Sequence, residues 1–432
     1  MLETIKNAWR VPEIRKKIFF TIFILFVFRL GAVIPVPFVN FGLLLETLEQ
    51  NGGALSSTNE FFNYLSILTG GGLEYGALFA MSVTPYINAS IIIQLLAVAI
   101  PALERLSKQG EEGRKKLAQI TRYATVVLGL IQAIAYYVWL SSSGYVMATG
   151  GLKVFAAFVI ILTLTAGSAL VMWLGEQIDS KGIGNGISML LFAGIISRAP
   201  QAFAALWMYA VDANQWLPVI AIVLIFVLIV LFIVWMSNAE RRIPVQYAKR
   251  VVGRKQYGGQ NTHIPIKVNM SGVLPIIFAS SILMLPTMLL SFGWIKANST
   301  IHKVLSLFSV QGAFYAIIYF FLIIGFAYFY TTIQYNPVEM ANNLRKNSGA
   351  IPGIRPGKPT SDFITRILSR ITLLGALFLS VLAILPIFVG KIGSLNISIG
   401  GTSVLIIVGV ALDLVQNLES QLMMRHYKGF LD

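Results

Sequence analysis

Ten stretches of about twenty residues, almost entirely apolar, recur along this chain of 432 residues. An apolar run of that length is what an α-helix needs to cross the hydrocarbon core of a bilayer. The pattern therefore predicts an all-α polytopic membrane protein with ten transmembrane helices. Their predicted windows are residues 18–34, 76–100, 118–140, 154–174, 187–203, 217–236, 273–292, 313–333, 371–389 and 402–418.

The second window differs from a helix that faces only lipid. It contains Pro85, Asn88 and Gln94, and it follows three consecutive glycines, residues 70–72. Polar side chains and non-helical backbone are tolerated at membrane depth only where protein or a water-filled cavity surrounds them. We therefore expect this window to face protein or a water-filled cavity rather than lipid alone. The stretch 60–69 before it is about three helical turns long, about half of a full span, and is not expected to cross the membrane by itself.

Composition and charge support a membrane location and predict the orientation. Hydrophobic residues make up 56% of the chain and charged residues 12%, with a mean hydropathy of +0.76, which lies outside the range of soluble domains. Of the 33 lysines and arginines, 27 fall in segments on one predicted side, five on the other, and Arg29 lies inside the first window. Since cytoplasmic loops carry the basic excess, we expect both termini in the cytoplasm.

Several kinds of chemistry are not supported by the sequence. Cysteine is absent and the three histidines are scattered, so we expect no disulfide, metal centre or cofactor. No catalytic constellation is recognisable, so an enzyme is not expected. Only Arg29 and Asp413 place a charge well inside a window, whereas an ion-coupled transporter would be expected to hold more. Each is expected to be buried against a partner helix or to reach an interface.

The segment Gly182-Ile-Gly-Asn-Gly186 is glycine-rich like a nucleotide-binding loop. It lacks both the lysine of the phosphate-binding loop and the G-x-G-x-x-G spacing of the dinucleotide-binding motif. It also follows a membrane window rather than a strand. We predict that it begins the fifth span as a flexible, closely packed turn. Asn185 would then hydrogen-bond a neighbouring helix.

Two segments predicted in the cytoplasm, 237–272 and 334–370, are too long for simple connections. They carry seven and six basic residues. Such loops are either topology signals and contacts with anionic lipids or docking surfaces for a partner. The stretch Gly353-Ile-Arg-Pro-Gly357 favours docking, because glycine and proline would hold its arginine in a fixed turn.

Five motifs, in order along the chain, resemble those of a known family. They are TPYINASIIIQLL (84–96), WLGEQI (173–178) followed by GIGNGIS (182–188), THIPIKVN (262–269), PGIRPG (352–357) and GGTS (400–403). With them the chain resembles the SecY/Sec61-alpha family, the large subunits of protein-conducting channels, over essentially its whole length. A multi-span permease for small solutes and a lipid-facing scaffold without a pore are the alternatives.

The resemblance implies a fold and a function. The fold would be two pseudo-symmetric five-helix halves, 1–204 with spans one to five and 205–432 with spans six to ten, related as an inverted repeat around a pore. The channel would be the central subunit of the Sec translocon in the bacterial plasma membrane. It would move unfolded preproteins passively and release hydrophobic segments into lipid through a lateral gate. The implied partners are SecE and SecG in a heterotrimer, the SecA ATPase, the ribosome, preproteins with signal sequences, membrane lipids, and YidC or SecDF.

The resemblance also implies site residues. The pore ring, whose branched aliphatic side chains would form a poorly wetted gasket, would be Val83, Ile87, Ile187, Leu191, Ile277 and Ile406. The family's usual ring residue is isoleucine, from which Val83 and Leu191 depart. The lateral gate would include Asn88 and Gln132, with Leu285 where some relatives have a polar partner.

The remaining implied sites are the docking surface and the plug. Docking of SecA and the ribosome would rest on Arg355, supported by Arg241, Arg242, Arg250 and Lys255, because arginine suits acidic and phosphate partners. The short re-entrant plug helix with its glycine hinge would comprise Asn59, Glu60, Phe61, Phe62, Asn63, Tyr64, Leu65, Ser66, Ile67, Leu68, Thr69, Gly70, Gly71 and Gly72.

Overall fold

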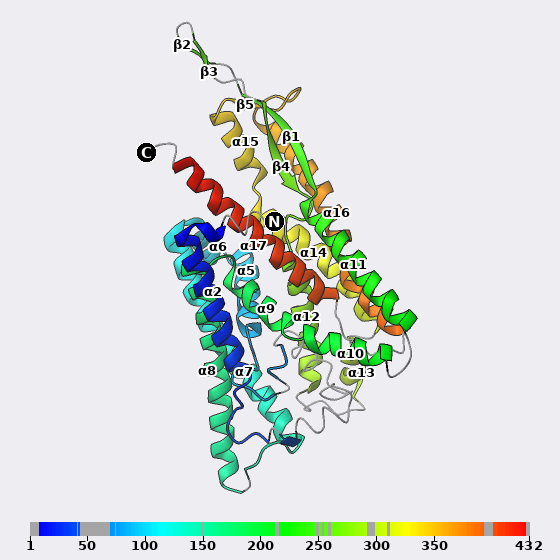
Figure 1. Ribbon diagram of the computed structural model, residues 1–432. Coiled ribbons are helices and arrows are strands. Elements are labelled where there is room, and N and C mark those ends of the chain that lie inside the picture. Colours follow the sequence, from blue (N-terminus) through cyan, green and yellow to red (C-terminus); the bar gives the residue numbers. More distant parts are fainter. Residues whose placement is uncertain are drawn as a thin grey trace. The chain divides into compact units, whose positions relative to one another are not determined.

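The chain is mostly helical, as the apolar pattern predicts (Figure 1). The computed structural model describes residues 8–40, 42–43, 70–73, 75–148, 150–211, 216–247, 250–252, 255–257, 261–291, 299–308, 312–392 and 401–428. A helix overlaps each of the ten predicted windows. Among the described residues, seven helices are long and apolar enough to cross a membrane, or eight if one bent pair counts as a single span.

The helices and strands follow one another along the chain in a simple order. The first group of helices is α2 (Pro12–Gly31), α5 (Thr84–Ala99), α6 (Pro101–Lys108), α7 (Glu111–Ser142), α8 (Leu152–Lys181), α9 (Gly186–Ile196), α10 (Ala199–Val211) and α11 (Trp216–Asn238). The strands are β1 (Glu240–Tyr247), β2 (Arg250–Val252), β3 (Lys255–Tyr257), β4 (Asn261–Lys267) and β5 (Gly349–Ala350). The second group of helices is α12 (Leu274–Ser291), α13 (Thr300–Ser306), α14 (Ala313–Gln334), α15 (Pro337–Lys346), α16 (Lys358–Ile392) and α17 (Gly401–Lys428).

The chain divides into two compact units. Residues 1–216, 283–312 and 410–432 form the first unit, and residues 217–282 and 313–409 form the second. The division into halves 1–204 and 205–432, and their relation as an inverted repeat, stay predictions.

In the first unit, α5 packs against α7, α7 against α8, and α2 against α8 and α9. Small residues bring these helices close together, as is usual in membrane proteins. A Cβ atom added to Gly129 of α7 would lie 2.7 Å from the hydroxyl oxygen of Ser168 on α8. The core of this unit is a cluster of buried side chains that includes Leu73, Met81, Tyr136, Leu140, Ile160 and Leu164.

The second predicted window is only partly helical. Helix α5 begins at Thr84 with Pro85 in its first turn, a position where proline needs no backbone donor and has the right φ. Residues 75–83 before it form turns. The helix ends at Ala99 because Ile100, which precedes Pro101, is extended. There α5 and α6 bend by 101°.

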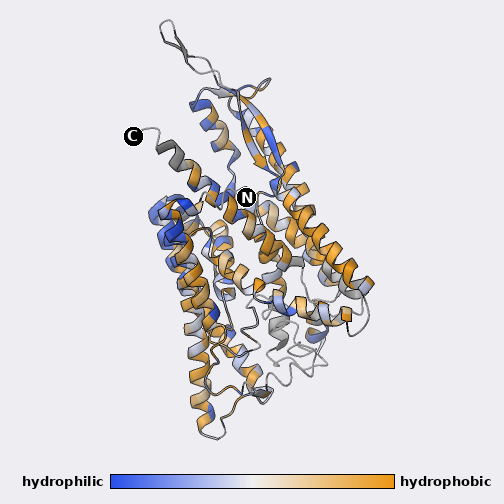
Figure 2. Cartoon of the chain, viewed as in Figure 1, coloured by the Kyte–Doolittle hydropathy of each residue, from blue (hydrophilic) through white to orange (hydrophobic). Residues whose placement is uncertain are grey.

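In the second unit, the two basic segments fold together, which the sequence pattern did not predict. Strand β1 pairs antiparallel with β4 on one side and with β5 on the other, in the order β4-β1-β5. The first pairing joins residues within 237–272, and the second joins that segment to 334–370. We call residues 240–247, 261–270 and 337–371, which contain β1, β4, α15, β5 and the start of α16, the basic substructure. Figure 2 shows hydrophilic residues on α15, β1 and β4, whereas α11 is almost uniformly hydrophobic.

The basic substructure has its own apolar core. Along β1, Ile243 and Val245 are buried while Arg242 and Pro244 are exposed, the alternation expected of a strand with one covered face. The buried side chains of this core are Ile243, Val245, Ile266, Met270, Leu344, Ile351, Ile364, Leu368 and Ile371. The two basic segments are therefore a folded body rather than two extended loops.

Replacing Ile364 with alanine is expected to destabilise the basic substructure by about 2–5 kcal/mol, because truncating a buried isoleucine leaves a cavity. The side chain is fully buried. Trypsin should therefore cleave the arginines and lysines of this substructure faster in the variant than in the wild-type protein. The control is Val338→Ala on α15, whose side chain is 58% exposed. Equal cleavage of the two variants would contradict the shared core.

Candidate functional site

The turn between α8 and α9 is capped by two side chains. Asp179 Oδ1, in the last turns of α8, accepts a hydrogen bond from the backbone N–H of Gly186 at 2.7 Å. Asn185 Oδ1 accepts from the backbone N–H of Ser188 at 3.0 Å. Both bonds satisfy N–H groups that the first turn of a helix leaves without partners. The oxygen of Asn185 thus caps its own helix, and a bond from Asn185 to a neighbouring helix stays a prediction.

Helix α2 holds the same turn from the other side. Thr21 Oγ1 accepts from the backbone N–H of Ile183 at 3.2 Å, and both residues are buried. A Cβ atom at Gly182 would lie 2.6 Å from that hydroxyl oxygen, and one at Gly186 would lie 2.0 Å from the carbonyl oxygen of Gly175. The predicted close packing of this glycine-rich turn is confirmed. The turn is thus fixed between α2 and α8.

This fixed turn sets the position of two pore-ring candidates. Ile187 and Leu191 lie one helical turn apart on α9, and Leu191 is buried. A Cβ atom at Gly175 would lie 2.8 Å from Ile187 Cδ1, so the Ile187 side chain packs against α8. Residues four apart share a helix face, so a shift of the turn would move both side chains together.

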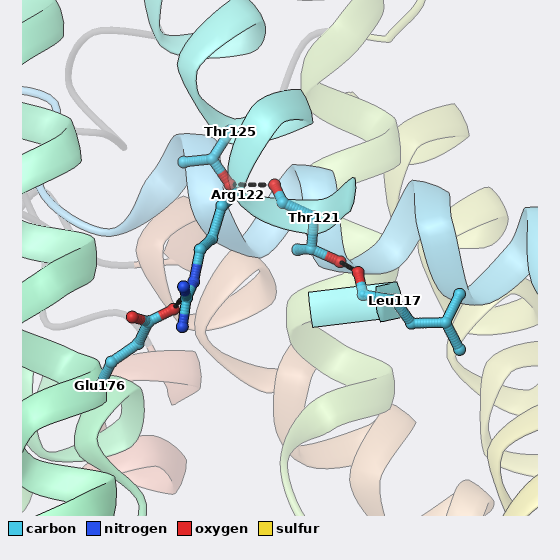
Figure 3. Close-up of polar contacts among 5 residues, drawn as sticks. All are labelled: Leu117, Thr121, Arg122, Thr125 and Glu176. Atoms are coloured by element: carbon cyan, nitrogen blue, oxygen red, sulfur yellow. Dashed lines mark hydrogen bonds and ion pairs between the residues drawn. The ribbon is translucent and has the colours of Figure 1, made fainter. Parts of the chain in front are cut away.

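An ion pair joins α7 to α8 near the capped turn (Figure 3). Arg122 Nε donates to Glu176 Oε1 at 2.7 Å. The side chains of Thr121 and Thr125 donate to carbonyl oxygens of their own helix, so they leave the pair undisturbed. Glu176 lies one turn before Asp179, so neighbouring turns of α8 bind α7 and α9.

The other ring candidates lie on α5, α12 and α17. Val83 is the residue that caps α5, Ile87 follows one turn later, and both are buried. Ile406 on α17 is buried and Ile277 on α12 is half-buried. A Cβ atom at Gly409 would lie 3.4 Å from Val273 Cγ1. Helix α17 and the start of α12 are therefore in contact about one helical turn from Ile406 and from Ile277. That all six candidates meet in one ring stays a prediction.

The lateral-gate candidates contain buried oxygens without partners. Asn88 Oδ1 on α5 and Gln132 Oε1 on α7 make no hydrogen bond with the described residues. The hydroxyl oxygens of Ser82 and Thr84, at the start of α5, are also buried without a hydrogen-bond partner among the described residues. A buried polar atom without a partner is costly. The start of α5 and the facing part of α7 therefore hold a set of groups that a new donor would stabilise. The side chain of Leu285 lies outside the part of α12 that the structure describes.

Only the end of the predicted plug falls on described residues. Residues 59–69 lie outside them, whereas Gly70, Gly71 and Gly72 are described and buried. The carbonyl of Gly71 accepts from the N–H of Tyr75 at 3.1 Å, and that of Gly72 accepts from the N–H of Ala77 at 2.9 Å. The glycines thus form a bonded turn. That they act as a hinge stays a prediction.

The docking candidates gather on the basic substructure and its β2–β3 extension. Arg355 is exposed, and its carbonyl oxygen accepts from the Thr360 hydroxyl at 2.8 Å. The turn around Arg355 contains Gly353 and Gly357, both with positive φ, which confirms the predicted fixed turn. On β1, Arg241 and Arg242 are exposed, and Arg242 pairs with Glu240. Arg250 and Lys255 fall on β2 and β3.

No metal-binding group is present in the part of the chain that the structure describes: nowhere in it do three His, Cys, Asp or Glu side chains come together. The arrangement consists of aliphatic residues on fixed helices and exposed arginines on a folded body.

Comparisons with known proteins show which family this chain resembles. The sequence profile of the SecY family matches residues 77–415. The chain is 42% identical to protein translocase subunit SecY of Thermotoga maritima over all of this chain and 98% of the relative. It is 45% and 44% identical to the proteins of that name from Halalkalibacterium halodurans and Bacillus subtilis, over the full length of each.

Solved structures share the fold. One is described as a protein conducting channel; it has a TM-score of 0.64 and 19% identity, and the match covers 96% of each chain. Another is Sec61 in the canine ribosome-channel complex, with a TM-score of 0.59, 17% identity and 96% of each chain covered.

Sequence reasoning missed two of the contacts that organise this site. Thr21 and Asp179 act through backbone N–H groups far along the chain or across a turn. The signal available was indirect: a glycine-rich turn exposes N–H groups, and each needs a nearby acceptor. Which side chain supplies it depends on helix packing.

Thr21→Val is expected to lower the free energy of unfolding by about 1–3 kcal/mol, because it leaves the buried N–H of Ile183 without a partner. The control is Thr163→Val on α8, whose hydroxyl donates only to the Val159 carbonyl of its own helix and whose loss should cost under about 0.5 kcal/mol. Thermal unfolding of the purified variants in detergent measures both. Equal shifts in the unfolding midpoint would contradict the role of Thr21.

Proposed function

Because this chain belongs to the SecY family and is a protein-conducting channel subunit of the Sec translocon, we propose that it conducts unfolded preproteins passively across a bacterial plasma membrane. It is not an enzyme, and the small-solute permease and the poreless scaffold are excluded by membership of this family. Both termini lie in the cytoplasm in this proposal, which rests on the distribution of lysine and arginine.

The polypeptide passes through a ring of aliphatic side chains. The observation that carries this proposal is the fixed α8–α9 turn, which holds Ile187 and Leu191 in place from two neighbouring helices. Val83, Ile87, Ile277 and Ile406 complete the ring. Branched aliphatic side chains wet poorly, so they resist ions when no chain is present and yield to a chain that passes.

The wall opens sideways where polar groups lack partners. Asn88 and Gln132 present buried oxygens on α5 and α7, and the proposal also assigns Leu285 to the gate. Interhelical hydrogen bonds in membranes are worth only about 0.6–2 kcal/mol each, so a gate built on them opens at little cost. A signal sequence that supplies donors or water would compete for these oxygens.

The basic substructure docks the cytoplasmic partners. Its arginines project from a folded body, so they lose less freedom on binding than they would on a mobile loop. We assign the SecA motor and the ribosome to this surface, and the canine relative in a ribosome-channel complex supports the second. Small membrane subunits, SecE and SecG, would complete a heterotrimer, and YidC or SecDF would associate with it.

Residues 59–72 act as the plug in this proposal. A similar structure, with 20% identity and a TM-score of 0.65, is described as showing that the plug domain of the SecY protein stabilises the closed state and maintains a membrane seal. The glycines Gly70–Gly72 end the corresponding segment here.

Arg355→Glu is expected to reduce SecA-driven export by about tenfold or more, because it removes a donor to acidic partners and adds a like charge. The amount of protein in the membrane should be unchanged, since the side chain is exposed. Export of a preprotein into inverted membrane vesicles with purified motor and ATP measures the effect. Lys153→Glu, the same charge change at an exposed position in α8, is the control. Wild-type export by Arg355→Glu would remove the docking assignment.

Ile406→Thr is expected to raise the ion conductance of the resting channel and the export of preproteins with defective signal sequences, because a hydroxyl in the ring wets it. Ile406 is 2% exposed. Single-channel recording in planar bilayers measures the leak. Val381→Thr, at a side chain on α16 that is 54% exposed, is the control. If Ile406→Thr matched the control in both measurements, Ile406 would not belong to the ring.

A further inference from the structure

Arg29 binds a backbone carbonyl far along the chain. It lies in the last turn of α2, inside the first apolar window, and its side chain is partly buried. Its Nη1 donates to the carbonyl oxygen of Gly70 at 3.2 Å, across 41 residues of sequence. Charged side chains within a span are costly, face the protein interior and mark functional positions. The contact therefore calls for a role beyond packing.

Gly70 is held on its other side by α9. Its φ is +65°, and a Cβ atom added to it would lie 2.4 Å from the carbonyl oxygen of Gly194 and 2.7 Å from Ser197 Oγ. Ser197 Oγ itself donates to the Gly194 carbonyl at 2.6 Å. Only glycine fits this conformation and this space. Gly70 is thus fixed between Arg29 and the last turns of α9.

The residues after Gly70 are bonded to α7 and to the segment that follows α2. The carbonyl of Leu73 accepts from the buried Tyr136 hydroxyl on α7 at 2.8 Å. The carbonyl of Gly76 accepts from the N–H of Val36 at 2.8 Å. Gly70 is the first described residue of this bonded segment, and Arg29 is the side chain that holds it.

We propose that Arg29 is a positioning residue that anchors Gly70 to α2 and thereby fixes the glycine turn 70–72 in the resting channel. The inference rests on the plug assignment in the proposed function. Guanidinium suits this task because it keeps its proton and offers five donors in a rigid fork, whereas lysine is a flexible point charge. Loss of the anchor loosens the glycine turn and with it the seal.

The anchor is tested by the accessibility of Leu73, which is fully buried. The chain contains no cysteine, so Leu73→Cys provides a single reactive thiol in the full-length channel in membrane vesicles. Adding Arg29→Met should speed alkylation of that thiol by a small maleimide about tenfold, as expected for loss of a hydrogen bond from a charged donor. Adding Arg29→Lys should give an intermediate rate. The control is Phe26→Met, one turn earlier on α2 and 58% exposed, which should leave the rate unchanged.

The functional consequence is measured separately, with Arg29→Met in the chain without the cysteine. Ion conductance per resting channel should rise, and so should export of a preprotein with a defective signal sequence. A residue that only stabilised the fold would lower the amount of channel and leave the leak per channel unchanged.

The two measurements separate the inference from the function on which it rests. An unchanged alkylation rate in the Arg29→Met background would overturn the anchor, whatever the leak. Faster alkylation without a leak would support the anchor and contradict the sealing role of segment 59–72. Faster alkylation in Arg29→Met, together with an ion leak that is smaller in Arg29→Lys than in Arg29→Met, would support both the anchor and the sealing role of segment 59–72.

Discussion

A buried peptide group is out of reach of water, so it must find its hydrogen-bond partner inside the protein. Helices satisfy this requirement by themselves, but the turns around residues 70–83 and 182–186 do not. In both turns the missing partners come from other segments: Tyr136 and Arg29 for the first, and Thr21 and Asp179 for the second. Among the described residues, these two irregular turns are therefore tightly constrained. Ile187 and Leu191, which follow the second turn on α9, inherit that constraint.

The same constraint explains the distribution of glycine and of small polar side chains. Several glycines lie where a helix approaches a backbone carbonyl, as Gly186 does at Gly175. Many hydroxyl groups bond their own helix, as that of Thr163 does, and the hydroxyl of Thr21 also reaches a turn. Exceptions among the described residues include the hydroxyl oxygens of Ser82 and Thr84 and the amide oxygens of Asn88 and Gln132, which are buried without partners. Unpaired buried groups are expected where a structure must change state, because a second state in which these groups gain hydrogen bonds is thereby favoured.

The sequence was sufficient for the positions of the helices and for the fixed turn around Arg355, because apolar length, glycine and proline act locally. It did not predict where α5 begins within its window. The helix begins only at Thr84 because Ser82 has a positive φ and hydrogen-bonded turns precede it, and neither can be read from the apolar pattern. It did not predict the β-sheet either, because strands as short as Gly349–Ala350 carry no periodic signal. The partner of Arg29 depends on packing between segments 41 residues apart, which no local pattern encodes.

The pairing of β1 with β5 delays the assembly of the sheet during synthesis. About a hundred residues separate Tyr247 from its partner Gly349, and ribosomes add about 5–20 residues per second. For about 5–20 s, therefore, the edge of β1 that β5 will cover has no strand beside it, while α12 and α14 are made and inserted. An uncovered strand edge is a template for wrong pairing. A newly made channel thus cannot present its complete basic surface until α14 and α15 have been synthesised. A chain truncated before β5 would therefore not be bound by partners that require that surface.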